Sequence, residues 1–280
     1  MISLSQTAMV KRVVKMCISM VFLLFSEMCR LACVFKERGC PYPFVVLTYH
    51  VVGKEEAELF SRQMDDIERL AEPVSASFHG LPNARTRRIA VTFDDAFRCI
   101  VDNALPEVSK RNIPITIFVP MGYLGKNPRW IPDPNHKYLS EVVLTADELK
   151  CLPAERVSIG SHTVNHPDLS KLNDDALDEE LKGSKHQLEE LLGREVNLLA
   201  FPFGAYDARV LRHAQKAGFT RVFSNLPRLS RANGETYLVG RIGADPSDWP
   251  LEFRLKIRGA YRWLSMAVSM KRRLLRVGHV

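Results

Sequence analysis

The stretch Ile89-Ala-Val-Thr-Phe-Asp-Asp95 is a short run of apolar and β-branched residues that ends in two adjacent carboxylates. A run of this length and composition is typical of a buried strand. Comparable runs recur along the chain, and segments with helical spacing of apolar residues separate them. The predicted strands are 45–50, 89–93, 115–119, 157–159, 198–201, 220–223 and 238–242, and the main predicted helices are 55–71, 97–111, 173–192 and 207–217.

Strands that alternate with helices predict an α/β domain with a largely parallel sheet. About seven such units in roughly 200 residues favour a distorted (β/α) barrel. In barrels of this kind the active site lies at the carboxyl ends of the strands, so polar residues directly after each strand are the candidates for chemistry. A short helix is also predicted after Thr145, which would cap it together with Glu148.

The charge of the chain is concentrated at its two ends. The formal net charge is +7, but residues 1–40 hold six Lys/Arg against two Asp/Glu, and residues 251–280 hold eight against one. The remaining residues therefore carry a net charge of about −4, which argues against a nucleic-acid groove through the centre. We expect no nucleic-acid partner, and we expect basic ends that contact an anionic membrane surface.

Three regions follow from this pattern. Residues 1–40 read as a basic and apolar helix that anchors the chain to a membrane or packs on the domain, 41–250 as the α/β domain, and 251–280 as a basic amphipathic helix. None of the six cysteines forms a C-x-x-C pair, which favours reduced thiols. The predicted location is the cytoplasmic face of a membrane rather than a secreted or periplasmic site.

The carboxylate pair has two readings from the residues alone. Asp94 and Asp95 follow a strand, and adjacent side chains diverge, so one could bind a metal while its neighbour stays free as a base. Alternatively, one caps the following helix and the other is solvated.

The stretch Ser161-His-Thr-Val-Asn-His166 follows another predicted strand. Two histidines four residues apart, with one carboxylate, make a ligand set that leaves a position open on a metal, as catalytic sites do. On their own such a pair is a weak signal, and the two could be loop histidines. Pro202 and Phe203 follow the strand 198–201, and His50 ends the strand 45–50.

The motifs TFDDAF (92–97), SHTVNH (161–166) and FPFGAYD (201–207) occur in the order and spacing of the polysaccharide deacetylase family, the NodB-like carbohydrate esterases. The segments LTYH (47–50) and 103–119 also resemble that family, so the resemblance covers about residues 44–225.

The resemblance implies specific roles. Asp95, His162 and His166 would bind one divalent metal ion, with zinc as the default, and Asp94 would be the general base that activates the attacking water. The oxyanion would be held by the metal and by a backbone N–H near Phe203. The implied substrate is an acetylated glycan or polysaccharide.

The chain departs from the family pattern at three positions. Ala200 stands where an arginine often orients the base, Ala96 stands where glycine is common, and no general-acid histidine is found after Trp249 apart from the near-terminal His279. Arg241 and His50 are the candidate replacements for the missing groups. Trp249 either forms a wall facing the sugar or packs in the core.

These observations leave three functions for the domain, and a fourth reading makes the protein a peripheral membrane scaffold held by its basic ends. The first is a metal-dependent hydrolase that removes acetyl groups from an N-acetylated sugar in a polysaccharide or glycan precursor. The second is an O-acetyl esterase on the same scaffold, because an alkoxide leaving group needs less help from an acid than an amine does. The third is a weak or inactive carbohydrate-binding member of the fold.

Overall fold

A computed structural model describes residues 6–35, 42–79, 86–227, 236–268 and 270 of the chain. Within these residues the strands form one sheet in which every pairing is parallel. The strands are β1 (Phe44–Tyr49), β2 (Glu72–Pro73), β3 (Arg88–Phe93), β4 (Ile115–Val119), β5 (Val157–Ser161), β6 (Leu198–Ala200), β7 (Arg221–Ser224), β8 (Leu238–Gly240) and β9 (Ile242–Gly243).

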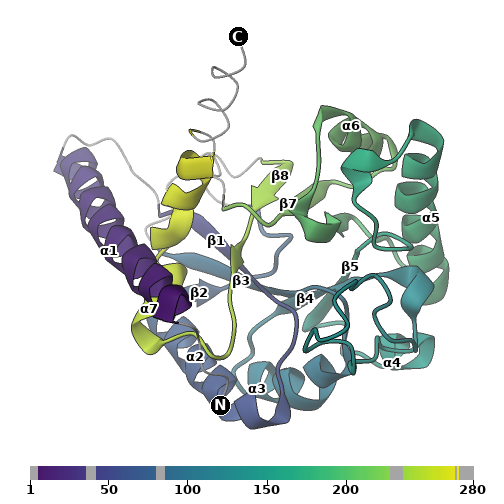
Figure 1. The fold of residues 1–280 in the computed structure, drawn as a ribbon, viewed down its shortest axis with the longest axis horizontal. Coiled ribbons are helices and arrows are strands. Elements are labelled where there is room, and N and C mark those ends of the chain that lie inside the picture. Colours follow the sequence, from purple (N-terminus) through teal and green to yellow (C-terminus); the bar gives the residue numbers. More distant parts are fainter. Residues whose placement is uncertain (1–5, 36–41, 80–85, 228–235, 269, 271–280) are drawn as a thin grey trace.

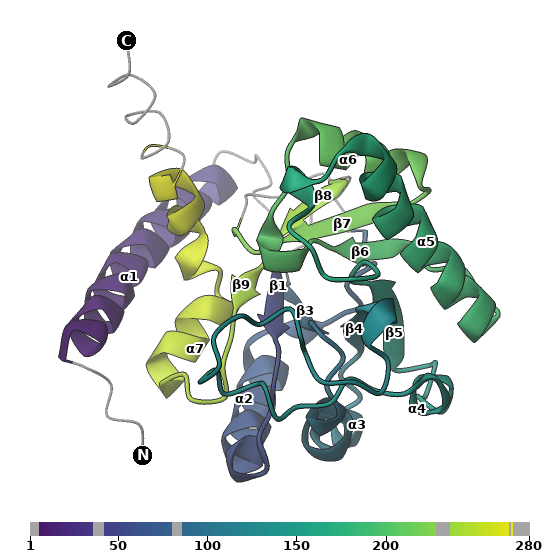
Figure 2. The same cartoon turned by 45° about the vertical axis from the view of Figure 1, so that its right-hand side comes forward.

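Helices surround this sheet (Figure 1, Figure 2). They are α1 (Gln6–Phe35), α2 (Ala57–Leu70), α3 (Leu105–Lys110), α4 (Ala146–Lys150), α5 (Asp174–Leu192), α6 (Ala208–Lys216) and α7 (Pro250–Ile257). The strands are buried on both faces, as expected when crossover helices cover a parallel sheet.

The order of the strands shows how the sheet curls. It runs β8-β7-β6-β5-β4-β3-β1-β9, with β2 added beside β3. The two outermost strands, β8 and β9, are separated in sequence by the single residue Arg241. Because one residue joins both edges, the sheet must bend round until its edges nearly meet. The predicted distorted (β/α) barrel is therefore confirmed. The predicted strand 238–242 is split at Arg241, which lies at the seam.

Local sequence signals explain where several helices begin and end. Thr145 caps α4 as predicted: its Oγ1 accepts a hydrogen bond from Glu148 N at 3.2 Å, and the Glu148 carboxylate accepts one from Thr145 N at 2.8 Å. This reciprocal pair satisfies two backbone donors that the first turn leaves free. Asn173 caps α5 by accepting from Ala176 N at 2.9 Å. Gly193 ends α5 with φ +63°, a conformation that glycine adopts without a steric penalty.

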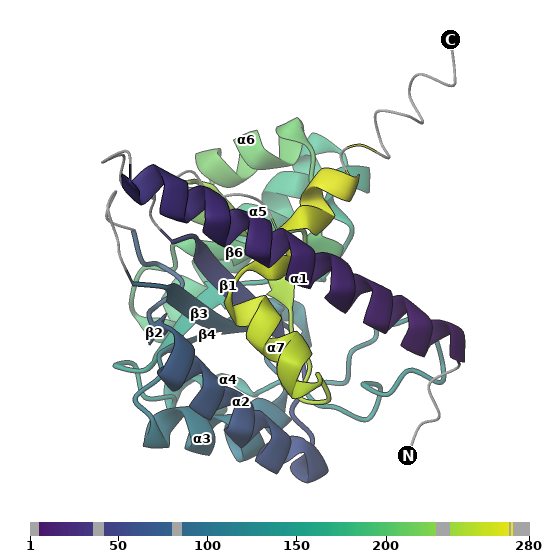
Figure 3. The same ribbon diagram turned by 90° about the vertical axis from the view of Figure 1, so that its left-hand side faces the viewer.

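The two ends of the chain differ in detail from the prediction. α1 occupies most of the predicted segment 1–40 and lies across the outside of α7 (Figure 3). The predicted helix 251–280 is interrupted: α7 ends at Ile257, and Gly259 takes φ +72° before helical structure resumes. The most basic part of that segment, 271–280, lies outside the described residues. The division into three regions stays a prediction.

The cysteines whose side chains the structure describes are not paired with one another. Cys17, Cys29, Cys99 and Cys151 are free. In the described part of the chain, no helix combines the length and apolarity needed to cross a bilayer. The location on the cytoplasmic face of a membrane stays a prediction.

Candidate active site

The candidate residues meet at the carboxyl ends of the strands, as the barrel rule predicts. Asp94 and Asp95 directly follow β3, His162 follows β5, and Arg241 lies between β8 and β9. His50 directly follows β1. Parallel pairing puts all of these strand ends on one rim, so residues distant in sequence become neighbours.

A cluster of three buried side chains has the geometry of a metal site. Asp95 Oδ1 lies 3.3 Å from His166 Nε2 and 3.6 Å from His162 Nε2, and one ligand atom from each residue falls within 4.8 Å of the other two. His162 Nδ1 lies 2.8 Å from the carbonyl oxygen of Ala200. Since a carbonyl only accepts, Nδ1 carries the proton and Nε2 keeps its lone pair for a ligand.

Two further observations fit a cation at this cluster. Among the described residues, Asp95 Oδ1 is a buried oxygen with no hydrogen-bond partner, although it lies between the two Nε2 atoms. Burial lowers the pKa of His162 to about 4, so this imidazole is neutral near pH 7, the form that binds metals. The three residues therefore fit a divalent ion.

The loops that carry these side chains hold unusual backbone conformations. Asp95 (φ +69°), Thr163 (φ +69°) and His166 (φ +55°) are all in the left-handed region. This region costs a non-glycine residue on the order of 1–2 kcal/mol. Ala96 also takes φ +51°, which gives a physical reason for the glycine that is common at this position in the family. Such strain persists only where surrounding contacts enforce it.

Glu180 of α5 supplies such contacts for the histidine loop. Its carboxylate accepts hydrogen bonds from Val164 N at 2.8 Å, Asn165 N at 2.9 Å and Asn165 Nδ2 at 2.7 Å. His166 N in turn donates to Thr163 Oγ1 at 3.0 Å. Sequence reasoning missed Glu180. The signal available was an acidic residue on the buried face of a predicted helix.

Asp94 is held by Arg241 in a buried ion pair. Arg241 Nη1 and Nη2 donate to the two carboxylate oxygens at 2.6 and 2.7 Å, and both side chains are at most 1% exposed. Burial raises the pKa of Asp94, but the adjacent guanidinium outweighs it, so the pKa lies well below its usual range. Arg241 also donates to Asn225 Oδ1 at 2.7 Å.

The Asp94–Arg241 pair is relevant to Ala200, the position at which the family often has an arginine. The β6 strand supplies no arginine, yet the guanidinium of Arg241 reaches Asp94 from the seam between β8 and β9. Arg241 is thus placed where it can orient Asp94.

His50 lies beside Asp94. Its Nε2 lies 4.0 Å from Asp94 Oδ2, and its side chain is 36% exposed. Its ring stacks on Tyr138, with centroids 6.1 Å apart and planes at 18°. An accessible imidazole beside a buried carboxylate can deliver or receive a proton.

Aromatic rings flank the Asp95–His162–His166 cluster. Trp130 stacks on His166 at 4.6 Å between ring centroids, and Phe203 meets the same ring edge-on at 4.8 Å. Phe203 is 59% exposed, whereas Pro202 before it is buried. Trp130 and Tyr138 were missed by sequence reasoning because they lie in a loop without a recognisable motif.

Trp249 has a different environment. Its ring lies under the guanidinium of Arg12 from α1, at 4.6 Å from the centroid. It is also the N-cap residue directly before α7. The contact with α1 favours a packing role for Trp249 over a wall that faces a sugar.

Comparison with known proteins agrees with this geometry. Residues 82–222, half of the chain, match the family model for polysaccharide deacetylases. The chain belongs to the polysaccharide deacetylase family. The predicted family is confirmed.

Two Bacillus subtilis proteins are similar at 25% identity. The putative polysaccharide deacetylase YxkH aligns over 56% of this chain and 52% of its own length, and the peptidoglycan-N-acetylmuramic acid deacetylase PdaA over 51% and 48%. The chain thus spans about half the length of the curated relatives it matches.

Solved structures share the fold. The Streptococcus pyogenes deacetylase PplD in complex with acetate superposes with a TM-score of 0.63 at 24% identity, covering 78% of this chain and 99% of that one. IcaB from Ammonifex degensii gives a TM-score of 0.61 at 22% identity, covering 79% and 97%.

Proposed function

We propose that this protein is a metal-dependent hydrolase that removes acetyl groups from an N-acetylated sugar in a polysaccharide or glycan precursor. The observation that carries the proposal is the juxtaposition of a buried Asp95–His162–His166 cluster with a second carboxylate, Asp94, tethered by Arg241. Membership of the polysaccharide deacetylase family supports it.

Asp95, His162 and His166 would hold the ion. A divalent ion bound there would polarise the acetyl carbonyl and lower the pKa of the attacking water. Zinc suits this ligand set, although other divalent ions also fit it.

Asp94 would act as the general base. It is ionised throughout the working pH range because the guanidinium of Arg241 holds its pKa low. The bidentate contact leaves the carboxylate one orientation, which positions the oxygen that takes a proton from water. Arg241 is therefore a positioning residue.

His50 would act as the general acid. Cleavage of the C–N bond leaves an amine that must gain a proton, and an exposed imidazole within 4.0 Å of the base can supply it. This placement favours N-deacetylation over release of an alkoxide from an O-acetyl ester. The tetrahedral oxyanion would be stabilised by the backbone N–H of Phe203, since the amides of Gly204 and Ala205 already bond within the turn.

Phe203 would help to set the position of the sugar. It contacts the ring of His166 and is 59% exposed, so it offers apolar surface to the C–H face of a pyranose ring. Trp130 stacks on His166 and on Phe97, and it holds the imidazole in place. Pro202, buried before Phe203, fixes the turn that presents the ring of Phe203.

The test is release of acetate from N-acetylated sugar oligomers, measured beside O-acetylated oligosaccharides, with protein reconstituted in zinc. We expect release from the N-acetylated substrate, and roughly a 100-fold or larger drop in kcat for Asp94→Asn, as general bases typically contribute on the order of 10²–10⁴. His50→Gln should slow N-deacetylation more than ester cleavage.

Three results would contradict the proposal. Preferential cleavage of the O-acetylated substrate would identify an esterase. Full activity of Asp94→Asn would show that Asp94 is not the general base. Binding of oligosaccharides without any acetate release would show that the protein is a carbohydrate-binding member of the fold and not a hydrolase.

A further inference from the structure

One face of α1 is a large apolar surface that points away from the molecule. Ten of its large hydrophobic side chains are between 41% and 68% exposed, among them Val10, Val14, Val21, Phe25 and Met28. They account for most of the exposed large hydrophobic residues in the described chain. No described element covers this face in Figure 3, where α1 lies in front of α7. We call these ten side chains the outward face of α1.

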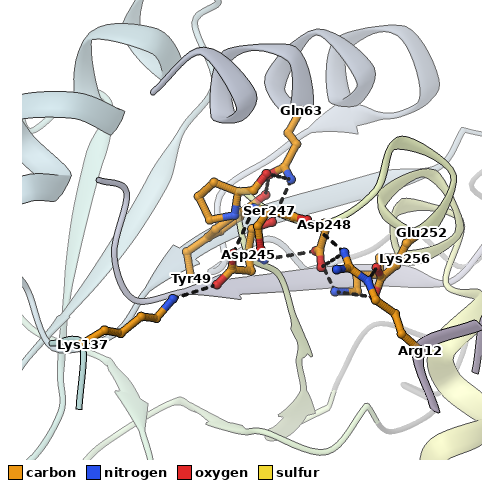
Figure 4. A network of polar contacts seen from close by, with 10 residues as sticks. Arg12, Tyr49, Gln63, Lys137, Asp245, Ser247, Asp248, Glu252 and Lys256 are labelled. Atoms are coloured by element: carbon orange, nitrogen blue, oxygen red, sulfur yellow. Dashed lines mark hydrogen bonds and ion pairs between the residues drawn. The ribbon is translucent and has the colours of Figure 1, made fainter. Parts of the chain in front are cut away.

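The opposite face of α1 is held on the domain by polar contacts. Arg12 Nε donates to Glu252 Oε2 at 2.5 Å, and Arg12 Nη2 donates to the carbonyl oxygen of Ser247 at 2.9 Å (Figure 4). Farther along, Trp263 Nε1 donates to the buried hydroxyl of Ser19 at 2.9 Å.

These contacts fix how the helix is rotated about its axis. Turning the outward face toward the domain would break the pairing of Arg12 with Glu252, whose side chain is only 9% exposed. It would also move the hydroxyl of Ser19 away from Trp263 Nε1 and break the hydrogen bond between them. The exposure of the outward face is therefore part of how α1 is attached.

The width and length of the outward face fit a membrane surface better than a second helix. At about 100° per residue it covers an arc of about 180°, and from Met9 to Leu31 it is about 33 Å long. A two-helix coiled coil buries only a narrow seam, so pairing with a second copy would leave much of this arc in water. A bilayer surface takes up a half-cylinder of apolar side chains along its whole length.

The charges of α1 fit an anionic surface. All five of its charged residues lie at or beyond the edges of the arc, and Lys11 and Lys15 are exposed there. Basic residues beside a buried apolar face can reach lipid phosphates. The chain segments 1–40 and 251–280, with net charges of +4 and +7, reinforce this preference.

We propose that the outward face of α1 lies in the interface of an anionic lipid bilayer, with the helix axis parallel to the membrane plane. α1 would hold the barrel at the surface without crossing it. This inference goes beyond the proposed deacetylation and does not depend on it.

The test is flotation of the full chain with vesicles made of equal amounts of phosphatidylcholine and phosphatidylglycerol. We expect the protein to float with them. The triple variant Val21→Ser/Phe25→Ser/Met28→Ser should bind about 100-fold more weakly, since it removes three large apolar side chains from the interface. Leu59→Ser is the matched control: it removes one exposed apolar side chain, 44% exposed, from α2 and should bind as the unmodified chain does.

Charge is tested separately. Lys11→Gln/Lys15→Gln should weaken binding to the mixed vesicles by about fivefold per lysine, and should have little effect on pure phosphatidylcholine. Circular dichroism should show that all variants keep the helical content of the unmodified chain.

Three outcomes would overturn the inference. The unmodified chain could fail to float with the mixed vesicles. The triple variant could float as well as the unmodified chain, which would place binding elsewhere. Light scattering could show a stable dimer that the triple variant loses, without vesicle binding, which would make this face a contact between copies.

Discussion

Removing the guanidinium of Arg241 tests how the candidate base is held. In Arg241→Met the carboxylate of Asp94 stays buried but loses two charge-assisted hydrogen bonds of 2.6 and 2.7 Å. Breaking a buried ion pair by removing one partner costs about 3–5 kcal/mol, because the remaining charge is left uncompensated. Asn225 also loses a donor. We expect the free energy of unfolding to fall by that amount near pH 7.

The contribution of Asp94 to the free energy of unfolding should have the opposite pH dependence in this variant. In the unmodified chain the folded pKa of Asp94 lies below its unfolded value of about 3.9, so its contribution to stability is present above that pH and is lost as the pH falls. In Arg241→Met burial should raise the folded pKa above the unfolded value. The contribution of Asp94 to stability is then present at low pH, where its carboxyl is protonated, and is lost as the pH rises through the folded pKa.

The assay is urea unfolding between about pH 4 and pH 7 with a chelator present, so that no metal contributes. The difference in unfolding free energy between the unmodified chain and Arg241→Met should grow with pH. Arg241→Lys keeps the charge but not the bidentate geometry, and should lose less stability. Asp94→Asn/Arg241→Met removes the uncompensated charge and should be more stable than Arg241→Met alone.

Two results would contradict a buried Asp94–Arg241 pair. One is a loss below about 1 kcal/mol, the range of an exposed ion pair, since it would mean that the pair is not buried in solution. The other is a difference that stays constant across the pH range, which would show that Asp94 does not titrate differently in the two proteins.

The remaining predictions concern the metal-binding role proposed for His162 and His166, the close packing of Gly160 against Phe118, and the loss of stability at acidic pH through Glu107. His162→Ala/His166→Ala should reduce bound zinc, measured by elemental analysis, from about one ion per chain to none; retained metal would place the ion elsewhere. Gly160→Ala would put a Cβ 2.5 Å from ring atoms of Phe118. It should cost about 1–3 kcal/mol in urea unfolding, whereas Gly243→Ala, with open space around it, should change stability by less than about 0.5 kcal/mol. Equal losses would mean that Phe118 moves aside. Hydrogen bonds, first from the Lys110 ammonium and then from a serine and an arginine, lower the pKa of Glu107 to about 2. Its stabilisation is therefore present above its unfolded pKa and is lost as the pH falls through the folded value. Glu107→Gln should lose less stability in that window when unfolding is followed by circular dichroism, and identical curves would contradict the assignment.

Several features of the fold could be predicted because they depend on local sequence. The strands β1, β3, β4 and β5 are short apolar runs between helical segments. Such runs are typical of strands in a parallel sheet that helices cover on both faces. The Thr145–Glu148 cap was predictable because its hydrogen bonds span three residues. Placement of chemistry at strand ends followed from parallel pairing alone.

Other features depend on how the sheet closes. Arg241 and Asp94 are 147 residues apart, and they meet only because the edges β8 and β9 are joined at Arg241. Sequence reasoning could name Arg241 as a candidate but could not supply its partner. Trp130 and Glu180 reach the histidine loop from a long loop and from α5, and no motif marks either residue.

Fold class, family and the rim of the sheet expected to carry the chemistry all follow from strand periodicity and motif order, which are local properties of the chain. The pairing of side chains across that rim, and the choice of which face of α1 is exposed, become visible only in the folded protein. Those outcomes depend on closure of the barrel and on a few distant contacts, such as Arg12 with Glu252, whose energies no local window of sequence contains.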